Sequence, residues 1–444
     1  MPLDLFPYQQ LGADKLASKF RYGLFDDMGV GKTAQAIGAM DRAGAKRVII
    51  VCPAAVRETW RGEIRKFATM QRRVLKASDI NDLSLFLRGK ADVMICSYDM
   101  AVKWTPRLQG DLYDAIVFDE AHYLKTPTAL RTKALLGAHC DGKSGLARYG
   151  AHVWFLTGTP IPNSPIDIWP WMRFCGATPL GLETFANRYF NVRQRSFSAS
   201  YDTRTERLEE LRQAMAPFFL RRTKAEAGLE LPPIWLTTQT VDGDTAEIRA
   251  LMAEYPNMER AVLEAIEKGG LSFLDAQHIA TLRRLVGEAK APAFVNLLAE
   301  ELDNGLDKVV VMGIHTRALH TVRDGLAKRG FRCVHLDGST REDQRMEAVN
   351  AFQSDPEVRV FIGNIRAAGT GLTLTSAADI IMFESDWAPA ANLQAIMRVH
   401  RISQERTVRV RFIVLANSID EIVETTVARK TAAIGKIGFE MQPG

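Results

Sequence analysis

The sequence has few cysteines, and they form no recognisable pattern. The five occur as Cys52, Cys96, Cys140, Cys175 and Cys333 in a chain of 444 residues. They are odd in number and never form a C-x-x-C pair. This spacing argues against a disulfide framework or a structural zinc site, and it favours a reducing compartment. The eight histidines likewise show no metal-binding spacing.

Long apolar runs and targeting signals are also missing. No apolar stretch reaches the length of a membrane span, and the first residues, MPLDLFPYQQ, lack the basic and apolar segments of a secretory signal. We therefore expect a cytoplasmic protein without a membrane partner. The net charge of +5 permits a polyanionic partner but does not require one.

Short apolar runs alternate with helix-compatible segments in both halves of the chain. Nearly all residues of each run are apolar, which is typical of parallel strands whose two faces are both covered by helices. The expected strands are 22–25, 47–52, 92–96, 115–118 and 152–157 in the first half, and 308–313, 331–336, 358–363, 379–383 and 408–415 in the second. The pattern predicts an α/β fold.

Three segments follow from this pattern. We expect one α/β domain over 1–174 and another over 291–444. Residues 175–290 carry long polar, helix-compatible segments, interrupted only by the strand-like IWLTTQTV at 234–241. We interpret this middle region as a helical insertion followed by a linker.

The stretch DDMGVGKT at 26–33 differs from the phosphate-loop pattern G-x-x-x-x-G-K-[ST] at its first position, where Asp26 replaces glycine. It still lies between an expected strand and an expected helix. Gly29 and Gly31 allow backbone amides to turn toward phosphate oxygens, and the helix N-terminus adds positive potential. Lys32 would reach the β/γ-phosphates, and Thr33 would hold Mg²⁺. The alternative is a glycine turn capped by threonine.

Two adjacent carboxylates, Asp119 and Glu120, follow the apolar run 115–118. Carboxylates next to a buried strand are costly unless a cation or a reaction uses them. Asp119 would bind Mg²⁺ through water, and Glu120 would orient and deprotonate an attacking water. The alternative is an exposed acidic turn, but the two motifs together favour a nucleotide hydrolase.

D-E-A-H after such a strand, followed by LTGTP at 156–160, resembles superfamily-two helicases and translocases. LFDDMGVGKT is similar to the Swi/Snf-type phosphate loop, which carries an acid at the position of Asp26, and FFLRRTKAEAGLELPP at 218–233 resembles a Swi/Snf signature. A-A-G-T-G-L, at 367–372, replaces the G-G pair that is common in this motif, and it resembles the annealing-helicase branch of the family more closely. Further segments with this resemblance are 6–13, 51–67, 95–100, 156–169, 335–352, 365–389 and 394–404.

The resemblance implies two RecA-like parallel-sheet lobes with helical insertions between them, and ATP hydrolysis with Mg²⁺ in the cleft between the lobes. It implies nucleotide contacts by Gln9, Met28, Gly29, Val30, Gly31, Lys32, Thr33 and Gly371, with Thr33 and Asp119 as magnesium ligands. The implied catalytic residues are Lys32, Asp119, Glu120, Arg398 and Arg401, and the implied coupling residues are His122, Thr157, Thr159 and Gln394. The implied DNA contacts are Pro53, Arg57, Ser97, Asn163, Ser339, Thr340, Gly369 and Thr370.

Arg398 and Arg401 stand three residues apart, a spacing that predicts one shared helix face. Planar guanidinium groups there can neutralise charge on the γ-phosphate in the transition state. The segment departs from the family pattern, because Ile396 and Met397 replace two acids and Ser403 replaces glycine. On charge alone, a basic face in solvent is the alternative.

The leading hypothesis is an ATP-driven translocase on double-stranded or forked DNA that does not separate strands. A strand-separating DNA or RNA helicase is the second, and a nucleotide-gated DNA-binding module with weak hydrolysis is the third. The sequence shows no attached chromatin-reading, nuclease or zinc module. We therefore expect a small bacterial or phage-encoded motor that associates with the nucleoid, and the sequence does not identify protein partners.

Overall fold

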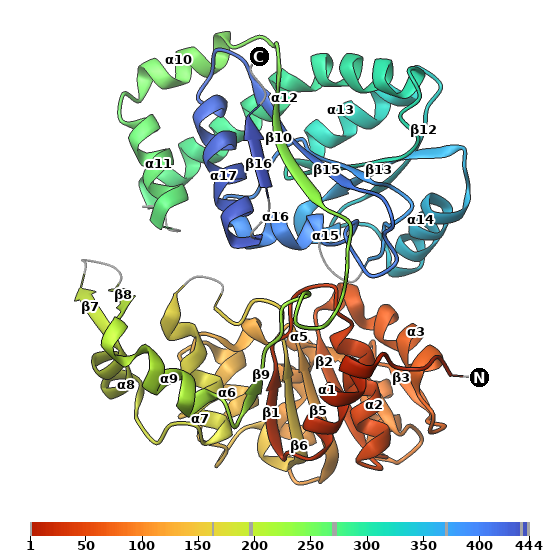
Figure 1. The fold of residues 1–444 in the computed structure, drawn as a ribbon, viewed down its shortest axis with the longest axis vertical. Helices are drawn as coiled ribbons and strands as arrows, with labels where there is room; N and C mark the ends of the chain where they lie inside the picture. The colour runs from red at the N-terminus through yellow and green to blue at the C-terminus, as the bar shows by residue number, and fades with distance from the viewer. Residues whose placement is uncertain are drawn as a thin grey trace. The chain divides into compact units, whose positions relative to one another are not determined.

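The computed structural model describes residues 2–161, 164–194, 199–268, 273–368, 372–435 and 438–441, and the chain forms two compact units, Met1–Glu230 and Leu231–Gly444. Each unit is built on a seven-stranded sheet with helices packed against it (Figure 1). The boundary between the units falls inside the interval 175–290, for which the sequence predicts a helical insertion and a linker.

All strand pairs of the first sheet are parallel, in the order β3-β4-β2-β5-β6-β1-β9. The strands are β1 (Arg21–Leu24), β2 (Val48–Cys52), β3 (Val74–Lys76), β4 (Val93–Ser97), β5 (Tyr113–Asp119), β6 (Gly150–Leu156) and β9 (Phe219–Leu220). The helices are α1 (Pro7–Ala17), α2 (Lys32–Arg42), α3 (Arg57–Phe67), α4 (Ile80–Leu87), α5 (Tyr98–Leu108), α6 (Leu130–Leu136), α7 (Trp169–Cys175), α8 (Leu182–Tyr189) and α9 (Leu208–Met215). An antiparallel ribbon joins β7 (Phe190–Gln194) to β8 (Ala199–Thr203).

Successive residues of the central strands enter two different cores, which explains their uninterrupted apolar sequence. In β2, Ile49 packs in a cluster with residues of α4, α5 and α7, whereas Ile50 packs in a cluster with residues of α1, α2 and α3. Both side chains are fully buried. A strand that is covered on both faces has no solvent-facing position for a polar residue.

The second sheet is also entirely parallel and has the order β12-β13-β11-β14-β15-β10-β16. Its strands are β10 (Ile234–Val241), β11 (Val309–Gly313), β12 (Arg332–Leu336), β13 (Val358–Asn364), β14 (Asp379–Met382), β15 (Val408–Leu415) and β16 (Gly438–Met441). The helices are α10 (Ala246–Glu254), α11 (Met258–Lys268), α12 (Phe273–Asp303), α13 (Thr316–Ala327), α14 (Glu342–Ser354), α15 (Ile365–Ala368), α16 (Pro389–Ile396) and α17 (Asp420–Gly435). The predicted α/β class with two parallel sheets is therefore confirmed.

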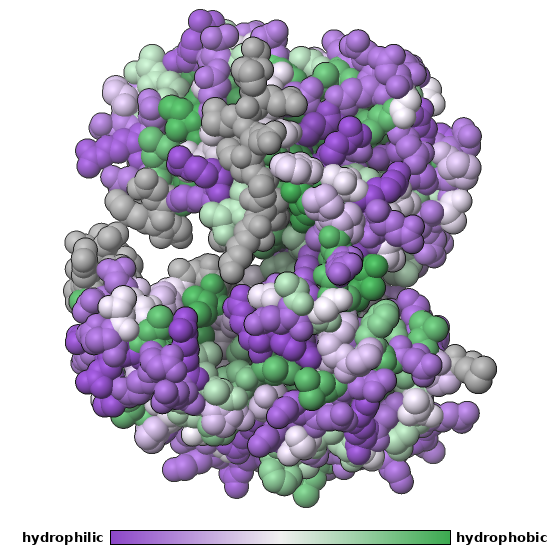
Figure 2. Space-filling model, in the orientation of Figure 1, coloured by the Kyte–Doolittle hydropathy of each residue, from purple (hydrophilic) through white to green (hydrophobic). Residues whose placement is uncertain are grey.

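The middle region contributes strands to both sheets. Within 175–290, β9 pairs with β1 of the first sheet, and β10 pairs with β15 over eight residues of the second. Among the described residues, no helix combines the length and the apolar character that a bilayer crossing requires. Figure 2 shows hydrophilic residues over much of the visible surface of each unit, with smaller apolar areas between them.

Candidate active site

The glycine loop joins β1 to α2 and leaves backbone amides of the helix available. Gly29 and Gly31 adopt φ values of 85° and 75°, which a residue with a side chain rarely adopts. Gly31 is also the N-cap of α2 and supplies no side-chain oxygen to cap it. The first amides of the helix can therefore bind an anionic ligand.

Lys32, the first residue of α2, points back along this loop. Its Nζ donates hydrogen bonds to the backbone oxygens of Asp26 at 2.7 Å and Asp27 at 2.8 Å. Desolvation lowers the pKa of Lys32, although the nearby carboxylates of Glu120 and Asp119 act in the opposite direction. The loop thus holds a cation close to two carboxylates of another strand end.

Asp26, the acid that replaces the first glycine of the general pattern, is fully buried and paired. Arg222, just after β9, donates from Nε to Oδ1 at 3.1 Å and from Nη2 to Oδ2 at 2.5 Å. Gln35 of α2 donates to the same carboxylate at 3.2 Å and accepts from Arg222 at 2.8 Å. The acid is therefore an anchor that joins the glycine loop to β9 and α2.

The segment that begins α1 contacts the loop from another side. Gln9 donates from Nε2 to the backbone oxygen of Val30 at 3.3 Å, and the hydroxyl of Tyr8 donates to that oxygen at 3.1 Å. The backbone oxygen of Tyr8 accepts a 2.7 Å hydrogen bond from Arg222. Gln9, for which the resemblance implies a nucleotide contact, thus lies against the loop. Met28 also lies at the site. Gly158, which follows β6, is close to both Met28 and Lys32: a Cβ added at Gly158 would stand 2.6 Å from Met28 Cγ and 3.3 Å from Lys32 Nζ.

Asp119 and Glu120 lie where β5 ends. Asp119 accepts hydrogen bonds from Trp60 Nε1 at 2.7 Å and from the Glu120 amide at 2.9 Å. Burial and the neighbouring Glu120 charge raise the pKa of Asp119 to about 6, despite the Trp60 hydrogen bond. Glu120 has φ 50°, an uncommon value for a residue with a side chain. Both residues are partly exposed, and the side chain of Glu120 is 21% exposed.

His122 connects Glu120 to the end of β6. Its Nδ1 lies 3.2 Å from Glu120 Oε2, 3.3 Å from Thr157 Oγ1 and 3.4 Å from Thr159 Oγ1. The Thr159 amide donates to Thr157 Oγ1 at 3.1 Å. Three of the four residues that the resemblance assigns to coupling, His122, Thr157 and Thr159, therefore form one network that includes Glu120.

Three of the expected DNA contacts lie in the first unit near ends of strands. Cys52 pairs with Ser97, so Pro53 and Ser97 share the edge of the sheet at which β5 also ends. Ser97 Oγ accepts from the Met100 amide at 3.3 Å and caps α5. Arg57 begins α3 and donates to the Ala77 backbone oxygen at 2.6 Å. The expected contact Asn163 lies outside the described residues.

In the second unit, Asp337 organises Ser339 and Thr340. Its Oδ1 accepts from the Ser339 amide at 2.8 Å, from Ser339 Oγ at 2.6 Å and from Thr340 Oγ1 at 3.2 Å. The expected contacts Gly369, Thr370 and Gly371 lie outside the described residues.

The prediction that Arg398 and Arg401 share a helix face is wrong. Helix α16 ends at Ile396, and both arginines lie in the turns that follow. Arg398 Nε donates to the backbone oxygen of Gln394 at 3.1 Å, whereas Arg401 Nη1 donates to Leu372 O at 3.0 Å and Thr373 Oγ1 at 2.9 Å. Side-chain hydrogen bonds to other segments hold the turns that follow α16. His400 Nε2 lies 2.8 Å from the backbone oxygen of Pro232, and Gln404 donates to that of Ala377.

Arg222, like Tyr8, Gln35 and Trp60, contacts the site although the sequence alone suggested no role for it. It lies 196 positions from its partner Asp26. Two features of the sequence could have indicated this contact. An acid stands in the glycine loop, two arginines stand in LRRTK at 220–224, and both segments resemble the same family. Neither segment alone indicates that the two side chains meet.

Comparisons with known proteins give two family matches along the chain. The SNF2-related domain matches residues 18–284, and the helicase conserved C-terminal domain matches residues 290–403. The chain is 28% identical to the SWI/SNF-related matrix-associated actin-dependent regulator of chromatin subfamily A-like protein 1 homolog of Caenorhabditis elegans, over 98% of this chain and 62% of that protein. It is 28% identical to the DNA annealing helicase and endonuclease ZRANB3 of Bos taurus, over 97% of this chain and 40% of that protein. The chain thus spans less than two thirds of these relatives.

Among solved structures, the Sulfolobus solfataricus SWI2/SNF2 ATPase core in complex with dsDNA matches with 22% identity and a TM-score of 0.46. The match covers 99% of this chain and 96% of that chain.

Proposed function

Because the chain belongs to the SNF2-related family, we propose that it is a DNA-stimulated ATP hydrolase that moves along duplex DNA without separating the strands. The observation that carries this proposal is the group formed by Lys32, Asp119 and Glu120. Lys32 begins α2 directly after the glycine loop, at a helix N-terminus without a side-chain cap, and Asp119 and Glu120 lie where β5 ends.

The residues of the first unit fit a magnesium–phosphate group. Oxygen donors suit Mg²⁺, and Asp119 has only neutral hydrogen-bond donors, Trp60 Nε1 and the Glu120 amide, among the hydrogen bonds described above. A cation there would offset the repulsion between the adjacent carboxylates. Thr33 and Asp119 would hold the ion, which supplies charge neutralisation on the phosphate oxygens.

The side chains of the loop and the strand end have distinct roles in the proposal. Lys32 exchanges its backbone acceptors, the oxygens of Asp26 and Asp27, for oxygens of the β- and γ-phosphates. Glu120 orients the attacking water and accepts its proton. The amides that follow Gly29 and Gly31 hold phosphate oxygens in place. From the second unit, Arg398 and Arg401 are proposed to neutralise charge on the transferred group.

We further propose that His122 transmits the state of Glu120. Its Nδ1 is within 3.4 Å of Glu120 Oε2, Thr157 Oγ1 and Thr159 Oγ1, so movement of the Glu120 carboxylate changes a set of contacts shared with the segment after β6. Gln394, whose backbone oxygen holds Arg398, is proposed to act similarly in the second unit.

DNA is proposed as the partner on two grounds. One of the relatives reported above is a DNA annealing helicase and endonuclease. The chain also carries hydroxyl groups and backbone amides at strand ends, which suit contacts to phosphate. We propose the phosphate contacts Pro53, Arg57, Ser97, Asn163, Ser339, Thr340, Gly369 and Thr370, with Gln9, Met28, Val30 and Gly371 at the nucleotide.

The test is steady-state ATP hydrolysis at one fixed salt concentration, because DNA binding depends strongly on salt. Reactions would contain no nucleic acid, single-stranded DNA, double-stranded DNA, forked DNA or RNA. We expect strong stimulation by duplex or forked DNA. Stimulation by single strands or RNA alone would instead support a strand-separating helicase, and a rate near zero in all reactions would support a nucleotide-gated binding module.

A further inference from the structure

Two histidines and an aspartate meet on one side of the second unit, although they come from different segments. His320 lies on α13, His335 lies on β12, and Asp337 follows β12 directly. One ligand atom from each residue can be chosen so that all three atoms lie within 4.8 Å of one another. The two imidazole rings stand edge to face with their centroids 4.8 Å apart.

The group has polar atoms whose bonding is incomplete. Within the described part of the chain, His335 Nε2 is buried and has no hydrogen-bond partner, which is costly for an imidazole nitrogen. Asp337 uses Oδ1 for its hydrogen bonds from Ser339 and Thr340. Its Oδ2 lies 3.8 Å from His320 Nε2, too far for a hydrogen bond.

We propose that His320, His335 and Asp337 form a binding site for one divalent transition-metal ion of the zinc, nickel and cobalt class. Two imidazoles and one carboxylate are ligands that these ions favour, and three protein ligands leave a fourth position for water. The sequence spacing does not reveal the site, because its ligands become neighbours only when β12 packs beside α13.

Small side-chain movements suffice to form the metal geometry. Ligands at about 2.0–2.1 Å from zinc lie roughly 3–3.5 Å from one another in a tetrahedral site. The His320 side chain is 40% exposed and can rotate toward Asp337. The neighbouring positive charge of Arg323 is offset by Asp324, whose Oδ1 lies 2.8 Å from an Arg323 nitrogen.

The ion would link α13 to the segment that carries Ser339 and Thr340. Asp337 would bind the metal through Oδ2 while Oδ1 keeps its hydrogen bonds, so the metal would restrict the motion of both hydroxyl residues. The consequence for DNA binding rests on the proposed function, but the metal site itself does not.

The experiment is calorimetric titration of the full chain with Zn²⁺ in excess Mg²⁺, which masks the carboxylates of the nucleotide site. The visible spectrum of bound Co²⁺ serves as a second readout. We expect one tight zinc ion per chain. Loss of one outer-shell partner weakens metal binding about 10- to 100-fold, so removal of a ligand in His320→Ala should weaken it at least that much. His320 is partly exposed, and the variant should fold normally.

Two histidine variants in the first unit are matched controls. His139→Ala removes an exposed imidazole, and His122→Ala removes the histidine beside Glu120. Both should bind zinc as the parent protein does. The proposal is overturned if the parent binds no zinc, if His320→Ala binds it equally well, or if His122→Ala loses it. None of these results depends on whether the chain hydrolyses ATP.

Discussion

Each unit contains one lysine and two carboxylates at close range, and the two groups differ in their access to solvent. In the first unit, Lys32, Asp119 and Glu120 are all partly exposed. In the second, Lys290 is 1% exposed, and Asp420 and Glu424 are 6% and 5% exposed. The same residue types therefore form an accessible group in one unit and a sealed group in the other.

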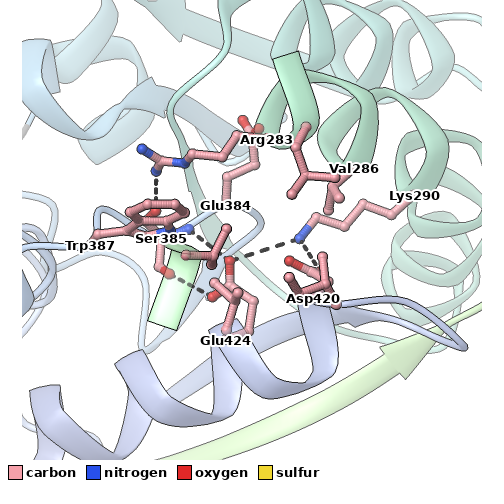
Figure 3. Close-up of a pocket in the computed structure, with 12 residues that line it drawn as sticks. Arg283, Val286, Lys290, Glu384, Ser385, Trp387, Asp420 and Glu424 are labelled. Atoms are coloured by element: carbon pink, nitrogen blue, oxygen red, sulfur yellow. Dashed lines mark hydrogen bonds and ion pairs between the residues drawn. The ribbon is translucent and has the colours of Figure 1, made fainter. Parts of the chain in front are cut away.

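The sealed group satisfies its own polar atoms, as Figure 3 shows. Lys290 Nζ donates to Asp420 Oδ2 and to the backbone oxygen of Ile413, both at 2.9 Å. The carboxylate of Glu424 accepts two hydrogen bonds from Ser385, one from Oγ at 2.6 Å and one from the backbone amide at 3.2 Å. Burial lowers the pKa of Lys290, but Asp420 and Glu424 outweigh it and raise the pKa overall.

The adjoining cavity of about 30 Å³ has room for only one or two water molecules. The sealed group thus holds α12, α17 and the end of β15 together without a ligand. In the first unit, by contrast, the lysine and the two carboxylates keep access to solvent. The difference indicates that the charged group with complete partners has a structural role, and it agrees with the catalytic role proposed for the accessible group.

The largest effect should follow Lys290→Met. Removing the ammonium leaves Asp420 and Glu424 without their cation, and breaking a buried pair costs about 3–5 kcal/mol. The free energy of unfolding of the second unit, measured in urea, should fall by this amount. The exposed Lys328→Met is the control. A loss below about 1 kcal/mol would show that the sealed group contributes little to stability.

The same change at Lys32 should affect catalysis and leave stability nearly unchanged. Lys32→Met removes a donor that would act on the phosphates, and loss of such a donor lowers the rate about 10²- to 10³-fold. ATP turnover and urea unfolding are measured on the same preparation. If Lys32→Met destabilises its unit as much as Lys290→Met does, the contrast between the two groups fails.

Glu424→Gln should flatten the pH dependence of stability. Burial raises the pKa of Glu424 from 4.5 to about 7, so the folded protein retains a proton that the unfolded chain loses between these values. The contribution of this group to stability is therefore greatest below pH 4.5 and falls as the pH rises to about 7. A shift of this size corresponds to at most about 3–4 kcal/mol.

Unfolding in urea at several pH values checks this prediction, and the exposed Glu405→Gln is the control. The difference in stability between Glu424→Gln and the parent should change over this pH range. A constant difference would contradict the assigned direction.

A double-mutant cycle tests the buried anchor of the glycine loop. Arg222→Gln and Asp26→Asn each break the pair, so the double variant should lose less stability than the sum of the two, with a coupling of about 0.5–3 kcal/mol. The more exposed pair Arg221 and Asp27, at 3.8 Å, provides a matched cycle with a smaller expected coupling. Equal couplings in the two cycles would refute a special role for Asp26.

The sequence predicted the sheet strands well where burial on two faces leaves an uninterrupted apolar run. The expected run 408–415 coincides with β15, and 115–118 lies within β5. It did not predict β3 or β9, which have three and two residues and carry too little pattern. The strand-like pattern at 234–241 coincides with β10. The sequence did not show which sheet contains this strand, because that depends on its pairing with the distant strand β15.

The candidate site shows the same limit. Lys32, Asp119 and Glu120 belong to short contiguous motifs, so the sequence alone was enough to propose them as candidates. The contact between Asp26 and Arg222 and the group at His320 arise from packing between distant segments, which no local spacing encodes. The resemblance to Swi/Snf-type proteins is confirmed by the SNF2-related match.

The most direct test of the account is ATP binding and hydrolysis by Glu120→Gln in the presence of duplex DNA. The variant keeps the size of the side chain and the site of phosphate binding but loses the proton acceptor. We predict ATP affinity close to that of the parent and turnover lowered by about 10²- to 10⁴-fold. Turnover equal to that of the parent would contradict the assignment of Glu120 as the base and, with it, the proposed reaction centre.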